Sequence, residues 1–139
     1  MRKIFCDDGS TATKLAWVND EGNLESSVTY NSFKKEQNVS LKGEAIGNYS
    51  VEGEKYAYDQ HSPKAVKTTN IDYQYSTVNL IAIHHALLKS GVQPQEIELI
   101  VTLPITEYYT SSLTPNEENI AKKKKNLQQL LKKFNNFSF

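Results

Sequence analysis

Three short segments near the start of the chain alternate apolar and polar residues with the period of two that is typical of β-strands. They cover residues 2–7, 13–18 and 24–30. Residues 19–23, with the sequence Asn-Asp-Glu-Gly-Asn, separate the last two segments and favour a turn. The pattern therefore predicts an antiparallel meander of three strands.

Between residues 31 and 75 the pattern changes to polar sequence that is rich in glycine and tyrosine. Short alternating pieces remain at residues 45–49 and 54–58. We interpret residues 31–75 as a small β-rich insertion on the side of the core, and we assign residues 1–30 and 76–134 to the core itself.

A long apolar helix is predicted to follow the insertion. Ser76 is a favourable N-cap, the helix is expected to run to Ser90, and Gly91 suits the left-handed position beyond the last turn. The apolar residues cover most of the helix circumference: Val78, Leu80, Ile81, Ile83, Leu87 and Leu88. We therefore expect both the sheet and a second layer to bury this helix.

Residues 98–103 form a nearly continuous apolar run that ends at Pro104. Such runs are typical of parallel strands that are buried on both faces. The run is therefore predicted to lie in the centre of the sheet.

The last predicted helix begins with Thr114 as N-cap, Pro115 in the first helical position and Glu117 completing a capping box. Its apolar stripe consists of Ile120, Leu127, Leu131 and Phe134. The lysines are expected mostly on the solvent side: Lys122, Lys123, Lys125, Lys132 and Lys133. We assign no structure to residues 135–139.

This order of strands and helices is that of an α/β half-domain of the ribonuclease-H-like kind, with a mixed sheet. The 139 residues are enough for one domain with a buried core. Sixteen basic residues balance sixteen acidic ones, so no overall field attracts nucleic acid or an anionic membrane. The single cysteine, Cys6, lies in an apolar strand and is interpreted as core. No stretch approaches the ~20 apolar residues of a membrane span, and we expect a soluble, cytoplasmic protein.

Candidate chemistry is concentrated between the first two strands. Asp7 and Asp8 end the first strand, Gly9, Ser10 and Thr11 form the turn, and Lys14 lies on the second strand. Backbone N–H groups in such a turn can bind phosphate, the lysine can neutralise its charge, and the carboxylates can order Mg²⁺ or its waters. A polar β-turn without a ligand explains the same residues.

Several further segments decide between these alternatives. Together with residues 7–15, the sequence resembles the ParM/StbA family of plasmid-segregation actin-like ATPases over about residues 1–125. The segments that carry the resemblance are Asn31–Lys34, Gly53–Tyr56, Thr68–Ile71, Gln74–Ser76, His84–Leu88, Thr102–Pro104, Thr106–Tyr109 and Pro115–Ile120. From about Asn126 the sequence leaves the family pattern, where a turn and a fifth strand are expected.

The resemblance implies an actin-ATPase N-terminal half that binds ATP or GTP with Mg²⁺ and forms filaments. It implies Asp7 for the Mg²⁺–water network, and Asp8, the Gly9–Thr11 turn and Lys14 for the phosphates. The implied partners are further copies or a full-length relative, and a ParR-like adaptor, with no direct contact to nucleic acid or membrane. The family's second half, which carries the adenosine pocket and the catalytic glutamate, cannot be located in this sequence.

Two functions therefore stay open at this point. The chain is either a truncated or split filament-forming ATPase, or a non-catalytic protein that caps or modulates filaments of a full-length relative. With half of the cleft we expect weak nucleotide binding and very weak or no turnover. We also expect self-association through the edge of the strand at residues 98–103, because unpaired strand edges associate.

Other candidate sites are weaker. His84 and His85 are neighbours on a helix and point about 100° apart, so a shared metal is disfavoured and one ring is expected in the core. The lysines of the last helix are expected to be solvated rather than bound to DNA. Trp17 is interpreted as core rather than as a stacking platform.

Overall fold

Two four-stranded sheets organise the chain. The computed structural model describes residues 1–36, 47–61, 65–129 and 131–133. In the first sheet the strand order is β3-β2-β1-β7, formed by β1 (Arg2–Asp8), β2 (Ala12–Val18), β3 (Leu24–Tyr30) and β7 (Ile97–Val101). The first three strands pair antiparallel and β7 pairs parallel to β1. The predicted meander and the mixed α/β class are confirmed.

The position of β7 differs from the prediction. Among the described residues its only neighbour is β1, so it forms an edge of the sheet rather than the centre. Its side chains are partly or largely exposed, and Ile100 keeps 37% of its surface in contact with solvent. An apolar run marks a strand, but it does not decide whether a second neighbour is present.

The second sheet has the order β4-β6-β5-β8. It contains β4 (Phe33–Lys34), β5 (Asn48–Val51), β6 (Glu54–Tyr58) and β8 (Leu131–Lys133), all paired antiparallel. Three of its strands come from the segment predicted to be β-rich. β8 comes from the far end of the chain, where the sequence predicted a continued helix.

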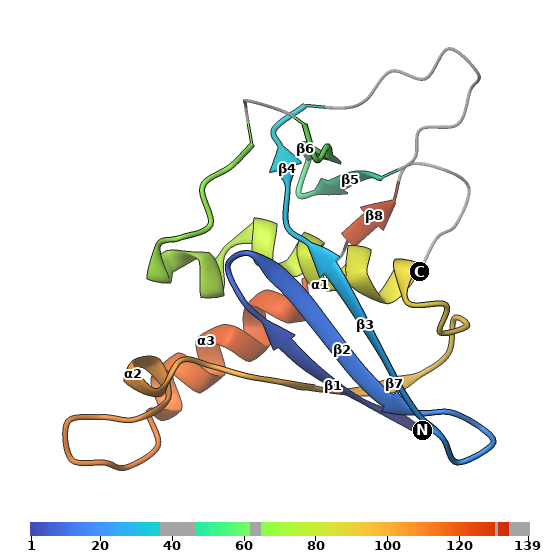
Figure 1. Cartoon of the computed structure of the whole chain (residues 1–139). Helices are drawn as coiled ribbons and strands as arrows, with labels where there is room; N and C mark the ends of the chain where they lie inside the picture. The colour runs from blue at the N-terminus through green and yellow to red at the C-terminus, as the bar shows by residue number, and fades with distance from the viewer. Residues whose placement is uncertain (37–46, 62–64, 130, 134–139) are drawn as a thin grey trace.

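Helix α1 (Thr77–Lys89) lies between the two sheets (Figure 1). Leu80 and Ile81 pack with residues of the second sheet such as Tyr49, whereas Ile83 and Ala86 pack against the first sheet. This arrangement explains why the helix is apolar around most of its circumference, and the second sheet is the second layer that the sequence required. Ser76 caps the helix through its side chain and Gly91 follows it with φ +83°, as predicted.

The last helix differs from the prediction at both ends. α3 (Glu117–Leu127) is capped by Asn116, whose side chain accepts a hydrogen bond from the Asn119 N–H, and not by Thr114. Thr114 instead accepts a backbone hydrogen bond from Thr110 in the loop after α2 (Ile105–Tyr108). The competing loop pairing explains why a well-formed capping sequence is not used.

At its other end α3 stops at Leu127, and the chain turns into β8. The predicted helix end at Phe134 and the tail at 135–139 lie outside the described residues. A short 3₁₀ helix, η1 (Ile71–Tyr75), precedes α1. None of the helices in the described part of the chain has both the length and the apolar content needed to cross a membrane.

Candidate functional site

The turn between β1 and β2 is the centre of the candidate site. Asp8 and Thr13 are the last residues paired across the two strands, and residues 9–12 connect them, with Gly9, Ser10 and Thr11 between the strands. A Cβ atom at Gly9 would lie 3.2 Å from the Ala12 carbonyl oxygen, which is closer than ordinary contact. A side chain at this position would therefore force the turn to shift by a few tenths of an ångström.

Two side chains hold the backbone carbonyls of the turn. Asn31 Nδ2 donates a hydrogen bond to the Gly9 oxygen at 2.7 Å, and Thr68 Oγ1 donates to the Ser10 oxygen at 2.6 Å. In a planar trans peptide the N–H points opposite to the C=O. The N–H groups that follow these carbonyls therefore point away from the two clamping side chains.

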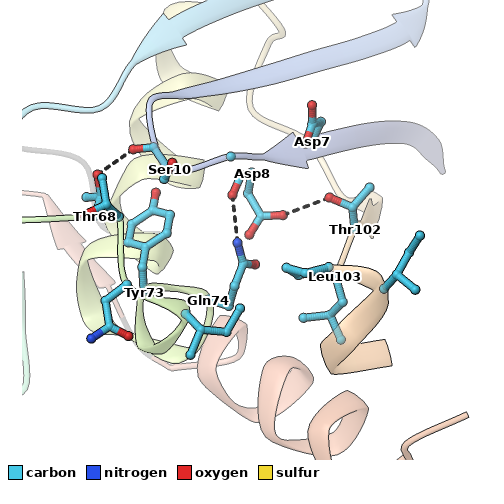
Figure 2. A pocket seen from close by; sticks show the side chains of 14 residues that line it. Asp7, Asp8, Ser10, Thr68, Tyr73, Gln74, Thr102 and Leu103 are labelled. Carbon is cyan, nitrogen blue, oxygen red and sulfur yellow. Dashed lines mark hydrogen bonds between the residues drawn. The ribbon is translucent and has the colours of Figure 1, made fainter. Parts of the chain in front are cut away.

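A cleft of about 490 Å³ opens beside the turn (Figure 2). It is lined by residues 7–10, by residues from 68 to 74 and by residues 102–105, which follow β7. Asp7 and Ser10 line the cleft, and Tyr73, Gln74 and Thr102 face it from the other segments. The cleft thus brings together three segments that are far apart in the sequence.

Asp7 and Lys14 form an exposed ion pair. They lie opposite each other in the β1–β2 register, with Lys14 Nζ 3.0 Å from Asp7 Oδ2. Their side chains keep 53% and 59% of their surface exposed. The pair lies on the face of the sheet that also exposes Phe5, so both charges are accessible to solvent beside the cleft.

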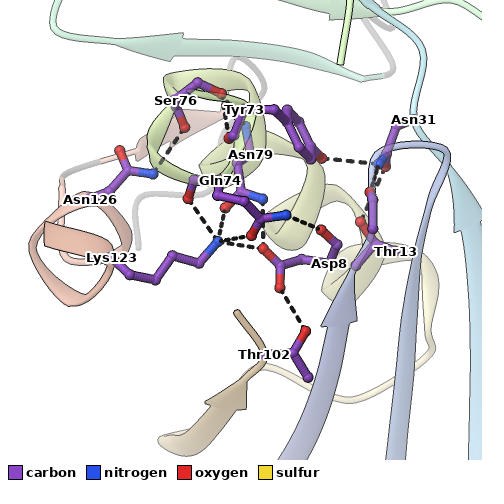
Figure 3. A network of polar contacts seen from close by, with 11 residues as sticks. Asp8, Thr13, Asn31, Tyr73, Gln74, Ser76, Asn79, Thr102, Lys123 and Asn126 are labelled. Atoms are coloured by element: carbon purple, nitrogen blue, oxygen red, sulfur yellow. Dashed lines mark hydrogen bonds and ion pairs between the residues drawn. The ribbon is translucent and has the colours of Figure 1, made fainter. Parts of the chain in front are cut away.

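Asp8 points to the opposite face of the sheet and is 1% exposed. Its carboxylate is paired with Lys123 of α3, and it accepts a hydrogen bond from Asn79 Nδ2 at 2.7 Å (Figure 3). The two neighbouring aspartates therefore cannot act as one carboxylate pair, because successive side chains of a strand point to opposite faces.

Lys123 corrects the prediction that places it on the solvent side of the last helix. It is 1% exposed, and its ammonium group also donates to the Gln74 carbonyl oxygen at 2.8 Å and to Asn79 Oδ1 at 2.8 Å. Burial lowers the pKa of Lys123 below its ordinary value, while the nearby Asp8 carboxylate opposes this shift. The charge is tolerated because every donor has an acceptor.

Burial also raises the pKa of the Cys6 thiol to about 12, and the Asp8 charge adds to that effect. Cys6 is 2% exposed and Trp17 is 7% exposed, which confirms both as core residues. His85 is buried as well, and its Nδ1 lies 2.5 Å from the Tyr49 hydroxyl. The prediction that one of the two adjacent histidines faces the core is confirmed.

Sequence reasoning missed several residues of the site: Asn31, Thr68, Gln74, Asn79 and Lys123. Asn31, Thr68 and Gln74 belong to segments that carry the family resemblance. The resemblance therefore marked these segments, but it gave none of the three residues a role in the site. Lys123 also had a signal, since it lies three residues after Ile120 and four before Leu127 and so shares the face of the apolar stripe. The run of four lysines around it favoured a solvated position instead.

Comparison with known proteins agrees with this geometry. The family model described as plasmid segregation protein ParM, N-terminal, matches residues 2–139. No curated protein matches the chain significantly in sequence. Among solved structures, ParM of Bacillus thuringiensis in its apo form superposes with a TM-score of 0.59 at 15% identity, covering 88% of this chain and 38% of that one.

Two further structures extend the comparison. The same ParM with ATP gives a TM-score of 0.56 at 14% identity and covers 88% of this chain and 37% of that one. The filament structure of AlfA from a B. subtilis plasmid gives 0.51 at 14% identity, covering 94% of this chain and 49% of AlfA. The chain thus spans less than half the length of these proteins, and the predicted actin-like fold is confirmed. It belongs to the family of the plasmid segregation protein ParM, of which it covers the N-terminal part.

Proposed function

We propose that the cleft binds the phosphates of ATP or GTP together with Mg²⁺, as the N-terminal half of an actin-like site in cytoplasmic plasmid segregation. One observation carries the proposal: the clamped turn of residues 9–11 opens onto a cleft of about 490 Å³. Among the structures with this fold are ParM complexes with ADP and with ATP.

Different residues bind the phosphates, neutralise their charge and support the turn. The backbone N–H groups of the Gly9–Thr11 turn and the Ser10 hydroxyl bind the terminal phosphates. Lys14 neutralises their charge from the exposed face of the sheet. Asp8 supports the turn through the end of β1, since its carboxylate is engaged on the inner side by Lys123.

The donor set at the cleft also fits Mg²⁺. Asp7 offers one exposed carboxylate, and Mg²⁺ prefers few carboxylates and keeps several of its waters. When bound, the ion would neutralise charge on the phosphates. Asp7 would hold it through water, while the pairing with Lys14 fixes the orientation of the carboxylate.

A second candidate function is a non-catalytic one, in which the chain caps or modulates filaments of a full-length relative. It is favoured by the apolar side chains on the uncovered face of the first sheet: Phe5, Val18, Val28 and Ile100 are 53%, 54%, 58% and 37% exposed. Exposed groups of this kind mark association surfaces. Self-association and contact with a ParR-like adaptor are compatible with both proposed functions.

Calorimetric titration of the chain with Mg²⁺-ATP and Mg²⁺-GTP tests the first function. Lys14→Met is expected to weaken binding at least about tenfold, because a charge-assisted contact to phosphate is lost. Lys3→Met is the matched control, since Lys3 lies on the same face and pairs with Glu98 at 3.6 Å, away from the turn.

Equal affinity of the Lys14→Met and Lys3→Met variants would overturn the assignment of Lys14. Absence of any nucleotide binding by the parent chain would overturn the first function. Co-sedimentation with filaments of a full-length relative would then be expected if the second function holds, and its absence would remove that function too.

A further inference from the structure

The buried ammonium group of Lys123 is surrounded by polar acceptor atoms. Its Nζ contacts four acceptors: Asp8 Oδ2, the Gln74 carbonyl oxygen, Gln74 Oε1 at 3.1 Å and Asn79 Oδ1. These groups come from the end of β1, from η1 and from α1, so a single ammonium group ties α3 to three other elements (Figure 3).

The network reaches the cleft at two points. Gln74 Nε2 lies 3.4 Å from the Asp8 carbonyl oxygen, whose peptide group leads directly into Gly9. Thr102 Oγ1 lies 3.4 Å from Asp8 Oδ1. Gln74, Thr102 and Asp8 all line the cleft. A change at Lys123 therefore changes the position of the residue from which the turn starts.

The negative charge of Asp8 gives a second reason why a lysine is needed at position 123. A buried carboxylate directly before a phosphate-binding turn would repel phosphate, and it would be costly without a partner. Lys123 lies on the inner side of Asp8 and cancels that charge, whereas Lys14 pairs with Asp7 on the outer side. The two lysines thus neutralise two adjacent aspartates from opposite faces of β1.

The neighbouring lysines do not share this placement. Lys122, Lys124 and Lys125 are exposed, and Lys122 lies over the Tyr75 ring at 4.4 Å. Asn126, three residues after Lys123 and on the same helix face, donates to the Ser76 carbonyl oxygen at 2.9 Å. This contact fixes the rotation of α3 that turns Lys123 inward.

We infer that Lys123 is a positioning residue for the phosphate-binding turn: it holds Asp8 and Gln74 in place and cancels the Asp8 charge beneath the bound phosphates. The inference rests on the proposed nucleotide site for its functional part. Its structural part, the ordering of the turn, is independent of any nucleotide.

Four variants of the full chain test the inference: Lys123→Met, Asp8→Asn, their combination, and Lys125→Met as the control on the exposed side of α3. Backbone ¹⁵N relaxation in NMR, expressed as order parameters, measures the order of residues 9–11. Calorimetry with Mg²⁺-ATP measures affinity. For Lys123→Met we expect the order parameters of the turn to fall from about 0.85 to below about 0.6. We also expect at least about tenfold weaker binding, because a buried charge has lost its partner.

The combined variant separates positioning from general damage. Asp8→Asn with Lys123→Met removes both charges, so we expect binding at least about threefold tighter than that of Lys123→Met alone, since no unpaired carboxylate remains beneath the phosphates. Affinity should stay below that of the parent, because the contacts of Lys123 with Gln74 and Asn79 remain lost. Unchanged order parameters of the turn in a folded Lys123→Met protein would overturn the inference. A combined variant that binds as weakly as Lys123→Met alone would also overturn it.

Two remaining outcomes are also decisive. If Lys123→Met alone does not fold, the combined variant is expected to fold and bind, and its failure to fold would show that Lys123 acts by packing rather than through Asp8. If the parent binds no nucleotide, the proposed function fails, and the order parameters of residues 9–11 alone decide the positioning role.

Discussion

Two adjacent aspartates of β1 form ion pairs that differ in almost every physical respect. Asp7 pairs with Lys14 in the neighbouring strand, and both side chains are more than half exposed. Asp8 pairs with Lys123, 115 residues away, and the two side chains are 0% and 2% exposed. Adjacent positions on a strand face opposite sides, so one residue step separates a solvated charge from a buried one.

The difference shows how one strand end can serve ligand binding and folding together. The exposed pair is screened by water and salt, so its charges stay available to a ligand at little cost in stability. The buried pair is satisfied by Asn79 and Gln74 and holds four elements in place. We therefore expect Asp7 and Lys14 to contribute mainly to binding, and Asp8 and Lys123 mainly to order.

The largest expected effect comes from breaking the buried pair. Lys123→Met is predicted to lower the free energy of unfolding by about 3–5 kcal/mol, because the Asp8 charge stays buried without its partner. Denaturant unfolding followed by far-UV circular dichroism measures the change. Lys125→Met, on the exposed side of the same helix, should change it by less than about 0.5 kcal/mol.

The opposite ranking of these two lysine variants would mean that the Asp8 carboxylate finds solvent or another donor when Lys123 is removed. The comparison between the two ion pairs would then fail, since both carboxylates would behave as exposed groups.

The exposed pair could be predicted from sequence, whereas the buried pair could not. Alternating apolar residues fixed the strands of the meander, and a hairpin register places Asp7 opposite Lys14. Lys123 lies in a polar run that fits a solvated helix face, and its acceptors come from distant segments. The helical spacing from Ile120 and Leu127 points Lys123 inward, but local pattern has no information on which distant groups it meets there.

Other differences have the same origin. The apolar run before Pro104 correctly predicted a strand, although β7 already ends at Val101, and its edge position depends on which strands are present to pair with it. The capping sequence at Thr114 is locally suitable, yet a loop pairing with Thr110 takes its place and Asn116 becomes the cap. Strand pairing decides the first case, and a competing hydrogen bond within the loop decides the second.

The Cys6 thiol lies on the buried face of β1, and its effect on the pH dependence of stability is expected to be of intermediate size. It lies two residues before Asp8 on the same face, and its pKa is raised from 9.0 to about 12, first by burial. A thiol that keeps its proton in the folded state stabilises the protein fully below pH 9, and this contribution is lost as pH rises towards 12. Unfolding midpoints should therefore decrease between pH 9 and 10.

Cys6→Ala is the control for this pH dependence, because it removes the thiol and keeps the site apolar. Its midpoint should stay flatter between pH 9 and 10, a window that lies below the ordinary tyrosine value of 10.0. Parallel pH profiles of the parent and Cys6→Ala would show that the thiol is not shielded, and that the inner face of β1 is open to water.

The smallest effect on stability is expected at the exposed pair. Lys14→Met should change the free energy of unfolding by less than about 1 kcal/mol, because its charge is already well solvated beside Asp7. Any loss should shrink further in 1 M NaCl, where the screening length falls to about 3 Å. Denaturant unfolding at low and high salt measures both. A loss as large as that of Lys123→Met, or one that salt leaves unchanged, would place Lys14 in the structural core of the hairpin and remove the distinction between the two faces of β1.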